Sequence, residues 1–399
     1  MNLPFESQRR FQLIFGFVMM LFAGMVFAWS LFAGPIQQDT GWAADQTSLV
    51  FTISLVTLCA GSLMGGLLDK HIGLRRTFLL AAVLIVLGFV GCSLSREIWH
   101  MYIFYGVLAG FAVGVFYNNG ITTVGSWYPD RVGFASGLML MGYGMGALAL
   151  GPVISVLIPA VGWRATFVVL GLVFGAMGVA AAFIVCKSPV ERGEDIETIA
   201  ADGEQFTPLQ VVQRANYWVY IFWAICMGAV GAGIIGHAST IASAMDAGPA
   251  AIVLATGLMS LTNGVSRPLW GFLYDRFRIE GVAVVVSLVL AVGLGLVQAA
   301  LVMKSTPLLL VAGLAIGVGY GGVSPATATF MRTKFGIVNY KQNFGLAICC
   351  VAPYAFGAYI LGVLLVTFGS YVVAVPYLFI ILALGALFLI PANLMARAS

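Results

Sequence analysis

The sequence has very little charge. Only 9% of its 399 residues are Asp, Glu, Lys or Arg, whereas 61% are hydrophobic, and the mean hydropathy is +1.02. A soluble globular domain carries about 25% charged residues, so this composition excludes one and indicates a polytopic membrane protein. The net charge of +4 comes from loops. It therefore reports orientation in the bilayer and does not indicate nucleic-acid binding.

The sequence also lacks the patterns of metal and redox chemistry. Its six cysteines all fall inside or at the ends of apolar runs, with no CxxC pair and no His/Cys cluster at metal spacing. We expect small hydrophobic side chains and neither disulfides, metal nor cofactor. A membrane enzyme needs a nucleophile and base, a metal cluster or paired carboxylates in or near the bilayer. None is found, so the sequence favours a protein that is not an enzyme.

Long apolar runs dominate the rest of the chain. Windows of about twenty apolar residues, each able to cross a hydrocarbon core of about 30 Å, can be placed twelve times. We therefore predict an all-α integral membrane protein with twelve transmembrane helices. The predicted spans are 11–35, 47–68, 76–95, 100–126, 132–158, 163–186, 216–244, 249–274, 281–303, 306–331, 342–368 and 371–395.

One long polar segment divides these spans six and six. The predicted organisation is an N-terminal half at 1–186, a cytoplasmic linker at 187–215 and a C-terminal half at 216–399. If the N-terminus is cytoplasmic, fifteen of the 19 Lys and Arg residues lie on the cytoplasmic side and three on the other. Because cytoplasmic loops are enriched in these residues, both termini are predicted in the cytosol, with the protein in the cytoplasmic (inner) membrane.

The two halves share a short charged motif. Gly65-x-Leu67-x-Asp69-Lys70 ends the second span, and Gly271-x-Leu273-x-Asp275-Arg276 ends the eighth. Repetition of this kind predicts two pseudo-symmetric six-helix halves, with a substrate site between them near the midplane.

Several stretches resemble one known family. The repeated motif is similar to the signature loop of the major facilitator superfamily. The stretches FAWSLFAGP (27–35), SWYPDRVGFASG (126–137) and NGVSRPLWGFLYD (263–275) resemble the oxalate:formate antiporter family and, more distantly, the monocarboxylate transporters. The resemblance runs the length of the chain and implies a transporter with the major facilitator fold. One departure is visible, since the loop after Asp69 is one residue longer than usual.

The resemblance implies that the charged loops gate the cytoplasmic side. Carboxylates at helix ends can meet helix N-termini and cations of the opposite half. The alternative is that these charges simply mark the membrane edge. The gating candidates are Asp69, Lys70, Arg75, Arg76, Asp275 and Arg276.

Arg267 is the main candidate for binding substrate. It lies eight residues before Asp275 and so about 12 Å inside the cytoplasmic edge. A charge at this depth is costly and is a functional hypothesis by default. A guanidinium offers a planar donor fork that matches a carboxylate, and the resemblance implies the same role. No Asp or Glu falls within the predicted spans to serve as a structural partner.

A second cation is missing. In oxalate-exchanging relatives a lysine follows the asparagine of an Asn-aromatic-Gly run by eight residues, whereas here that asparagine is Asn343 and the position is Val351. A dicarboxylate would keep an unbalanced charge in a low-dielectric site, so a monocarboxylate fits better. Monocarboxylate transporters usually have an acid one turn before the arginine and a lysine in the first span. In this sequence Asn263 occupies the position of the acid, and the first span contains no lysine. The proton-coupling scheme of the monocarboxylate transporters therefore does not carry over.

Other polar and aromatic residues complete the predicted substrate site. Asn263 can orient Arg267 or bond a backbone group, and His237 can bond substrate, carry a proton, or make a structural bond between helices. The aromatic candidates can close over a small acid or simply pack. Together the additional candidates are Asn263, His237, Tyr143, Tyr117, Phe27, Trp29, Tyr320 and Asn118.

The sequence thus predicts a secondary active or facilitative transporter of small organic anions, lactate- or formate-like monocarboxylates above all, working by alternating access. The expected partners are a small carboxylate and the lipid bilayer, with protons left open, and the protein is expected to be monomeric. The alternatives are an oxalate-type dicarboxylate exchanger, an exporter of another small metabolite or a drug, and an anion sensor. A cation exporter needs an intramembrane acid, and none is found.

Overall fold

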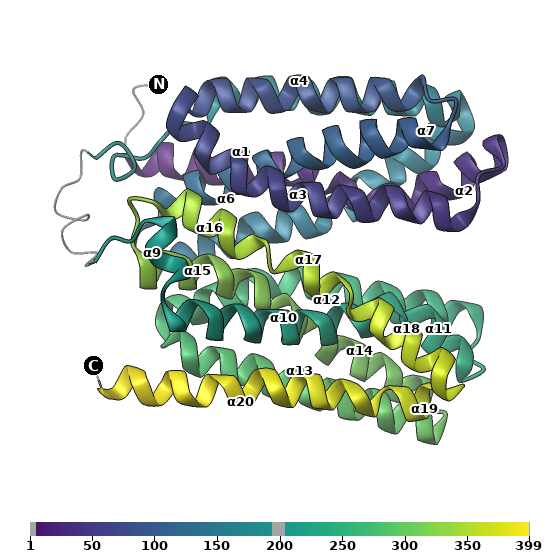
Figure 1. Cartoon of the computed structure of the whole chain (residues 1–399). Helices are drawn as coiled ribbons and strands as arrows, with labels where there is room; N and C mark the ends of the chain where they lie inside the picture. Colours follow the sequence, from purple (N-terminus) through teal and green to yellow (C-terminus); the bar gives the residue numbers. More distant parts are fainter. Residues whose placement is uncertain (1–4, 194–203, 399) are drawn as a thin grey trace. The chain divides into compact units, whose positions relative to one another are not determined.

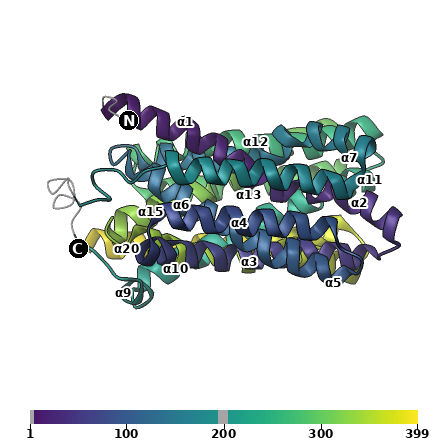
Figure 2. The same cartoon turned by 90° about the horizontal axis from the view of Figure 1, so that it is seen from above.

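The computed structural model describes residues 5–193 and 204–398, and this part of the chain is helical, without strands. The long helices of each compact unit run alongside one another (Figures 1 and 2). In chain order the elements are α1 (Phe5–Ala23), η1 (Gly24–Ala28), α2 (Trp29–Thr40), α3 (Ala44–Ile72), α4 (Leu74–Ser93), α5 (Ile98–Met101), η2 (Tyr102–Ala109), α6 (Gly110–Ser126), α7 (Val132–Ile184), α9 (Pro208–Val212), α10 (Ala215–Gly236), α11 (Ala238–Ala244), α12 (Pro249–Arg276), α13 (Ile279–Met303), α14 (Thr306–Gly321), α15 (Val323–Phe335), α16 (Tyr340–Ile348), α17 (Val351–Ala355), α18 (Gly357–Phe368), α19 (Tyr371–Ala374) and α20 (Pro376–Ala398).

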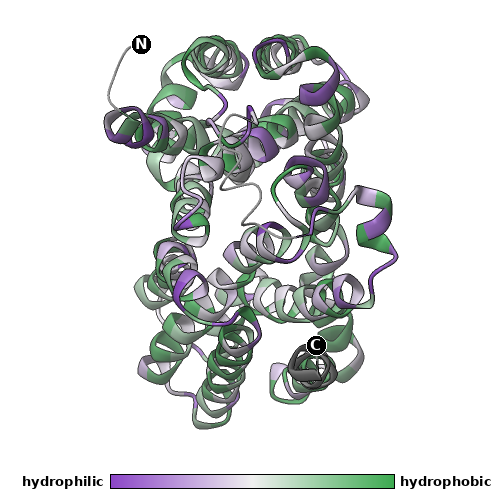
Figure 3. Ribbon diagram, turned by 90° about the vertical axis from the view of Figure 1, so that its left-hand side faces the viewer, coloured by the Kyte–Doolittle hydropathy of each residue, from purple (hydrophilic) through white to green (hydrophobic). Residues whose placement is uncertain are grey.

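The helices account for the predicted membrane spans. Ten helical stretches of the described residues are long and apolar enough to cross a bilayer, and hydrophobic residues dominate them (Figure 3). One of these, α7, contains two spans, because Gly162 interrupts it with a φ of 80°. The 28-residue α12 is also long enough, but carries Asn263 and Arg267. The all-α membrane architecture is therefore confirmed.

The chain folds as two compact units. The first contains Met1–Gln205 together with Met331–Cys349, and the second contains Phe206–Phe330 together with Cys350–Ser399. The chain thus passes from one unit to the other inside span eleven, where the turn at Cys349 and Cys350 separates α16 from α17. The predicted halves and linker stay a prediction, and part of that linker, 194–203, lies outside the described residues.

Glycines bring α3 and α6 of the first unit into backbone contact. A Cβ atom added to Gly61 of α3 meets the carbonyl oxygen of Phe111 at 2.0 Å, and one added to Gly114 of α6 meets that of Leu58 at 2.1 Å. Such close approach is typical of helix pairs in membranes, where small residues replace the hydrophobic effect as the basis of packing. This packing fixes α6 and its polar side chains against α3.

Replacing Gly61 with alanine is expected to destabilise the first unit. The added methyl group overlaps a backbone carbonyl, so the helices must separate, at a cost of about 1–3 kcal/mol. The measurement is the thermal unfolding midpoint in detergent. Gly295→Ala is the matched control, since a Cβ atom at this helical glycine meets nothing within 4 Å. A Gly61→Ala midpoint equal to that of the control would contradict the backbone contact.

Candidate functional site

The segment of α12 that carries Arg267 is held by α14 in the second unit. Trp270 Nε1 donates to the carbonyl oxygen of Val318 at 2.7 Å, and the Tyr274 hydroxyl donates to that of Gly322 at 3.2 Å. Gly317 leaves room for this contact, because a Cβ atom there meets Thr262 Oγ1 at 2.0 Å. These bonds fix the rotation of α12 about its axis.

Arg267 is buried. The residue is only 8% exposed, although it lies on a helix of the predicted membrane interior. Asn263 lies one turn earlier on the same helix, and no hydrogen-bond partner is found for its buried Oδ1 among the residues that the structure describes. A buried acceptor without a partner is costly. Asn263 and Arg267 thus place an amide and a cation on successive turns of one helix face.

Tyr320 lies near Arg267 and packs against a second tyrosine, Tyr354. Tyr320 of α14 lies close enough to Arg267 for an electrostatic interaction, and its ring contacts that of Tyr354. The two rings meet edge to face, with centroids 6.2 Å apart. Gly231 and Gly228 of α10 make room for the rings, because a Cβ atom at these glycines lies 2.4 Å from Tyr320 and 2.6 Å from Tyr354. The substrate role of Tyr320 stays a prediction, and the sequence did not single out Tyr354.

Other predicted residues lie in the first unit. The rings of Tyr117 and Tyr143 meet edge to face at 4.8 Å, so the structure brings these two together. Trp29 is buried, and its Nε1 donates to the carbonyl oxygen of Thr47 at 3.0 Å. Phe27 lies in η1, and its side chain is outside the described part of the chain. Their substrate roles remain predictions.

Asn118 is fully buried in α6. Its Nδ2 donates to the backbone oxygen of Lys341 at 3.0 Å and to Ser62 Oγ at 3.3 Å. Gly66 of α3 approaches the same place, since a Cβ atom there meets the Lys341 carbonyl carbon at 2.9 Å. Asn118 thus holds the start of α16 against α3 and α6.

His237 ends α10 and precedes α11. The sequence places it within span seven, and the structure adds that the helix is broken there. Both ring nitrogens have protein partners: Nδ1 is 2.8 Å from the Tyr371 hydroxyl, and Nε2 is 2.9 Å from the backbone oxygen of Ala358. Its substrate role is untested.

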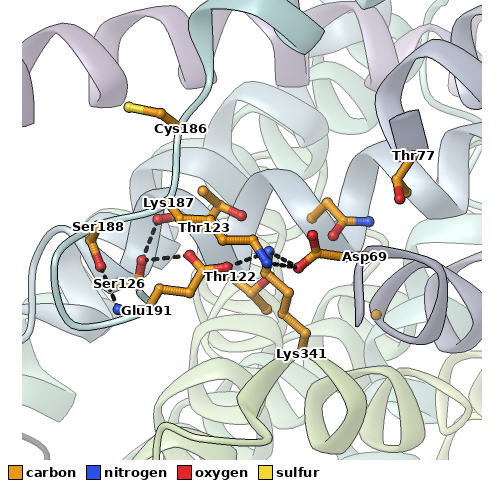
Figure 4. A network of polar contacts seen from close by, with 12 residues as sticks. Asp69, Thr77, Thr122, Thr123, Ser126, Cys186, Lys187, Ser188, Glu191 and Lys341 are labelled. Atoms are coloured by element: carbon orange, nitrogen blue, oxygen red, sulfur yellow. Dashed lines mark hydrogen bonds and ion pairs between the residues drawn. The ribbon is translucent and has the colours of Figure 1, made fainter. Parts of the chain in front are cut away.

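A buried ion-pair cluster surrounds Asp69 in the first unit (Figure 4). Asp69 Oδ2 lies 2.7 Å from Lys341 Nζ and 2.9 Å from Lys187 Nζ, while Lys341 Nζ also lies 2.6 Å from Glu191 Oε1. The Asp69 side chain is only 4% exposed and that of Lys341 9%. Two cations thus balance two anions, as burial of charge requires.

Hydrogen bonds fix the geometry of this cluster. Ser126 Oγ donates to Glu191 Oε2 at 3.1 Å, and Gln342 Nε2 donates to the backbone oxygen of Gly66 at 3.0 Å. A cavity of about 240 Å³ adjoins the cluster and is lined by Asp69, Lys70, Thr122, Ser126, Lys187, Glu191 and residues 337–342. Sequence reasoning singled out Asp69 but missed its partners Lys341 and Lys187, and it missed Glu191 as the second acid of the cluster.

The remaining gating candidates lie outside this cluster. Lys70, Arg76, Asp275 and Arg276 are exposed. The Arg75 guanidinium lies over the Phe183 ring, 4.0 Å from its centroid. Their gating roles are also untested.

The described residues contain neither a metal-binding cluster nor a disulfide. Among the described residues, no group of three or more His, Cys, Asp or Glu side chains could hold a metal ion. No disulfide joins any of the six cysteines.

Comparison with known proteins identifies the family to which this chain belongs. Residues 13–349 match the family model of the Major Facilitator Superfamily. The oxalate:formate antiporter of Oxalobacter formigenes is 28% identical over 273 residues, which cover 68% of this chain and 64% of that protein. The match thus spans just under two thirds of that relative. Mouse monocarboxylate transporter 11 is 25% identical over 78% of this chain and 69% of its own length.

Solved structures agree on the fold. The proton:xylose symporter XylE, bound to 6-bromo-6-deoxy-D-glucose, has a TM-score of 0.77 at 14% identity and covers 96% of both chains. The fucose:proton symporter FucP of E. coli has a TM-score of 0.68 at 12% identity. These neighbours are transporters and not enzymes. With its family match extending over most of its length, this chain belongs to the major facilitator superfamily of multi-pass membrane transporters.

Proposed function

We propose that this protein transports small organic anions, above all monocarboxylates, and that Arg267 binds their carboxylate. The observation that carries the proposal is the burial of Arg267 at 8% exposure on α12, next to Asn263 and Tyr320. A guanidinium can form two parallel hydrogen bonds to one carboxylate. The names of the relatives, an oxalate:formate antiporter and monocarboxylate transporters, support this substrate class.

The neutral residues around Arg267 favour one carboxylate over two. Val351 begins α17, three residues before Tyr354, and stands where the resemblance to oxalate exchangers implies a lysine. With one fixed cation, a monocarboxylate forms a neutral pair, whereas a dicarboxylate keeps a negative charge away from water. Tyr320 and Tyr354 can supply hydroxyl groups to a lactate-like acid.

Transport requires the site to open alternately to the two sides of the membrane. In this proposal the Asp69–Lys341 pair closes the cytoplasmic side and separates when that side opens. Both termini are proposed to face the cytosol, in an inner membrane, with the protein working as a monomer. Asp275 and Arg276, in the repeated motif, are proposed to assist at the same side.

The test is uptake of radiolabelled acids into proteoliposomes. We expect lactate and formate to enter at least about tenfold faster than oxalate, because an unbalanced buried charge costs more than the 1.4 kcal/mol that a factor of ten represents. Protein-free liposomes are the control. Val351→Lys is expected to shift the preference toward oxalate.

Two other uptake results would contradict the proposal. Oxalate uptake faster than that of every monocarboxylate would favour the dicarboxylate exchanger, and counterflow of oxalate against formate would identify exchange. If no carboxylate enters or competes while cationic drugs do, the anion proposal is wrong.

A further inference from the structure

The break between α10 and α11 is tied to two other helices through one imidazole ring. His237 Nε2 contacts the backbone oxygen of Ala358 in α18, and Nδ1 contacts the hydroxyl of Tyr371 in α19. The Tyr371 hydroxyl lies 2.7 Å from Thr240 Oγ1, which donates to the backbone oxygen of His237 at 2.9 Å. The last three contacts form a ring that returns to the His237 backbone, and the contact to Ala358 extends from the same imidazole.

The number of hydrogens available to these four contacts depends on the charge of His237. Four contacts of 2.7–2.9 Å need four hydrogens between their heavy atoms. Ala358 offers only a carbonyl oxygen, so Nε2 must carry a proton. A neutral imidazole then supplies one hydrogen, and Tyr371 and Thr240 supply one each. One contact is left with two facing lone pairs.

Protonation of Nδ1 completes the ring. Nδ1 then donates to the Tyr371 oxygen, the Tyr371 hydroxyl donates to Thr240 Oγ1, and the Thr240 hydroxyl donates to the backbone oxygen of His237. Every contact now has one donor and one acceptor. Such a chain of hydrogen bonds is cooperative and orients each hydroxyl in one direction.

Among the residues that the structure describes, no ion pair joins an acid to His237. In the described residues, the carboxylate that follows α11 is Asp246, which pairs with Lys304 at 3.2 Å. On the packed elements, Tyr359 of α18 is exposed, and Tyr377 of α20 stacks on Phe368. Gly362 of α18 faces the imidazole edge, with a Cβ atom there 3.6 Å from His237 Cε1. The ring is therefore the main polar environment of His237.

We propose that His237 is a proton-binding site and that its protonated form fastens the α10–α11 break to α18 and α19. Histidine is the side chain that ordinarily changes charge between pH 5 and 8, so acidification tightens this clamp and a rise in pH releases it. The inference goes beyond the proposed substrate, because it concerns a second ligand, the proton. It gives the transporter a pH-sensitive contact at the α10–α11 break, on a different element from Arg267.

The test is hydrogen–deuterium exchange of the purified transporter at pH 5.5 and pH 8.0, corrected for the intrinsic pH dependence of exchange. We expect peptides covering 233–245 to exchange about fivefold more slowly at the lower pH in the wild type, the effect of about one added hydrogen bond. His237→Gln, which keeps one donor and one acceptor but binds no proton, is expected to lose this difference. Tyr371→Phe is expected to reduce it.

Two further variants make the outcome decisive. His100→Gln replaces another histidine, stacked on Trp99 in α5, and is expected to keep the wild-type difference. Arg267→Ala is also expected to keep it, whatever happens to transport, so this test does not depend on the substrate proposal. An equal pH difference in the wild type and in His237→Gln, or none in the wild type, would overturn the proposal.

Discussion

Arg267→Ala is expected to lower carboxylate uptake about 30- to 4000-fold, because removing one partner of a buried, hydrogen-bonded charge pair costs about 2–5 kcal/mol. The substrate carboxylate then enters a desolvated site without a counter-charge. Arg267→Lys keeps the charge but loses the planar fork, so we expect an intermediate loss of about tenfold. Both are measured as initial uptake rates in proteoliposomes.

The fold itself is expected to survive this substitution. A charged side chain in the membrane interior is unfavourable for the empty protein, so alanine should not lower the thermal unfolding midpoint. Added lactate is expected to raise that midpoint in the wild type but not in Arg267→Ala, because a ligand stabilises only the state that binds it. Arg278→Ala removes an exposed arginine at the start of α13 and serves as the control. Uptake by Arg267→Ala at the rate of this control would refute the proposed site.

Most of the membrane spans could be predicted from the sequence because the bilayer imposes a single requirement. Each crossing needs about twenty apolar residues with internally bonded backbone, and that requirement is visible as hydropathy. The division of α7 into two spans is visible in the sequence for a different reason, because the stretch at 158–163 contains Pro159 and Gly162, and the helix is interrupted at Gly162. The breaks in span eleven were not predicted, since hydropathy stays high across α16, α17 and α18.

Pairing between distant residues was the main thing that the sequence could not supply. Arg267 was found because arginine is rare at membrane depth, a property of one position. Lys341 pairs with Asp69 across 272 residues, and Tyr371 meets His237 across 134. Those contacts depend on how helices pack, which hydropathy does not encode. Tyr354 was missed for a similar reason, because its nearness to Tyr320 depends on Gly228 and Gly231 of another helix.

Asp69→Asn is expected to lower uptake at least about tenfold, since it leaves the buried Lys341 and the partly exposed Lys187 with Glu191 as their single anion. Removing one member of a buried ion pair costs about 3–5 kcal/mol, and in our proposal that loss falls on the state closed to the cytoplasm. Asp130→Asn is the control, because Asp130 is an acid of the same unit that pairs with Arg9 at the surface. Its uptake is expected to stay within about twofold of the wild type.

Labelling of an introduced cysteine distinguishes opening of the cytoplasmic gate from unfolding of the protein. Thr122 is 1% exposed and lines the cavity beside Asp69, so Thr122→Cys in a cysteine-free background should react slowly with a maleimide. Adding Asp69→Asn is expected to speed this labelling about tenfold or more while most of the protein stays folded, because the weakened ion pair admits the reagent. Combining Asp69→Asn with Lys341→Gln should cost less uptake than the two single losses together, since the pair acts as a unit. Strictly additive losses with unchanged labelling would show that Asp69 marks the membrane edge and does not hold a gate.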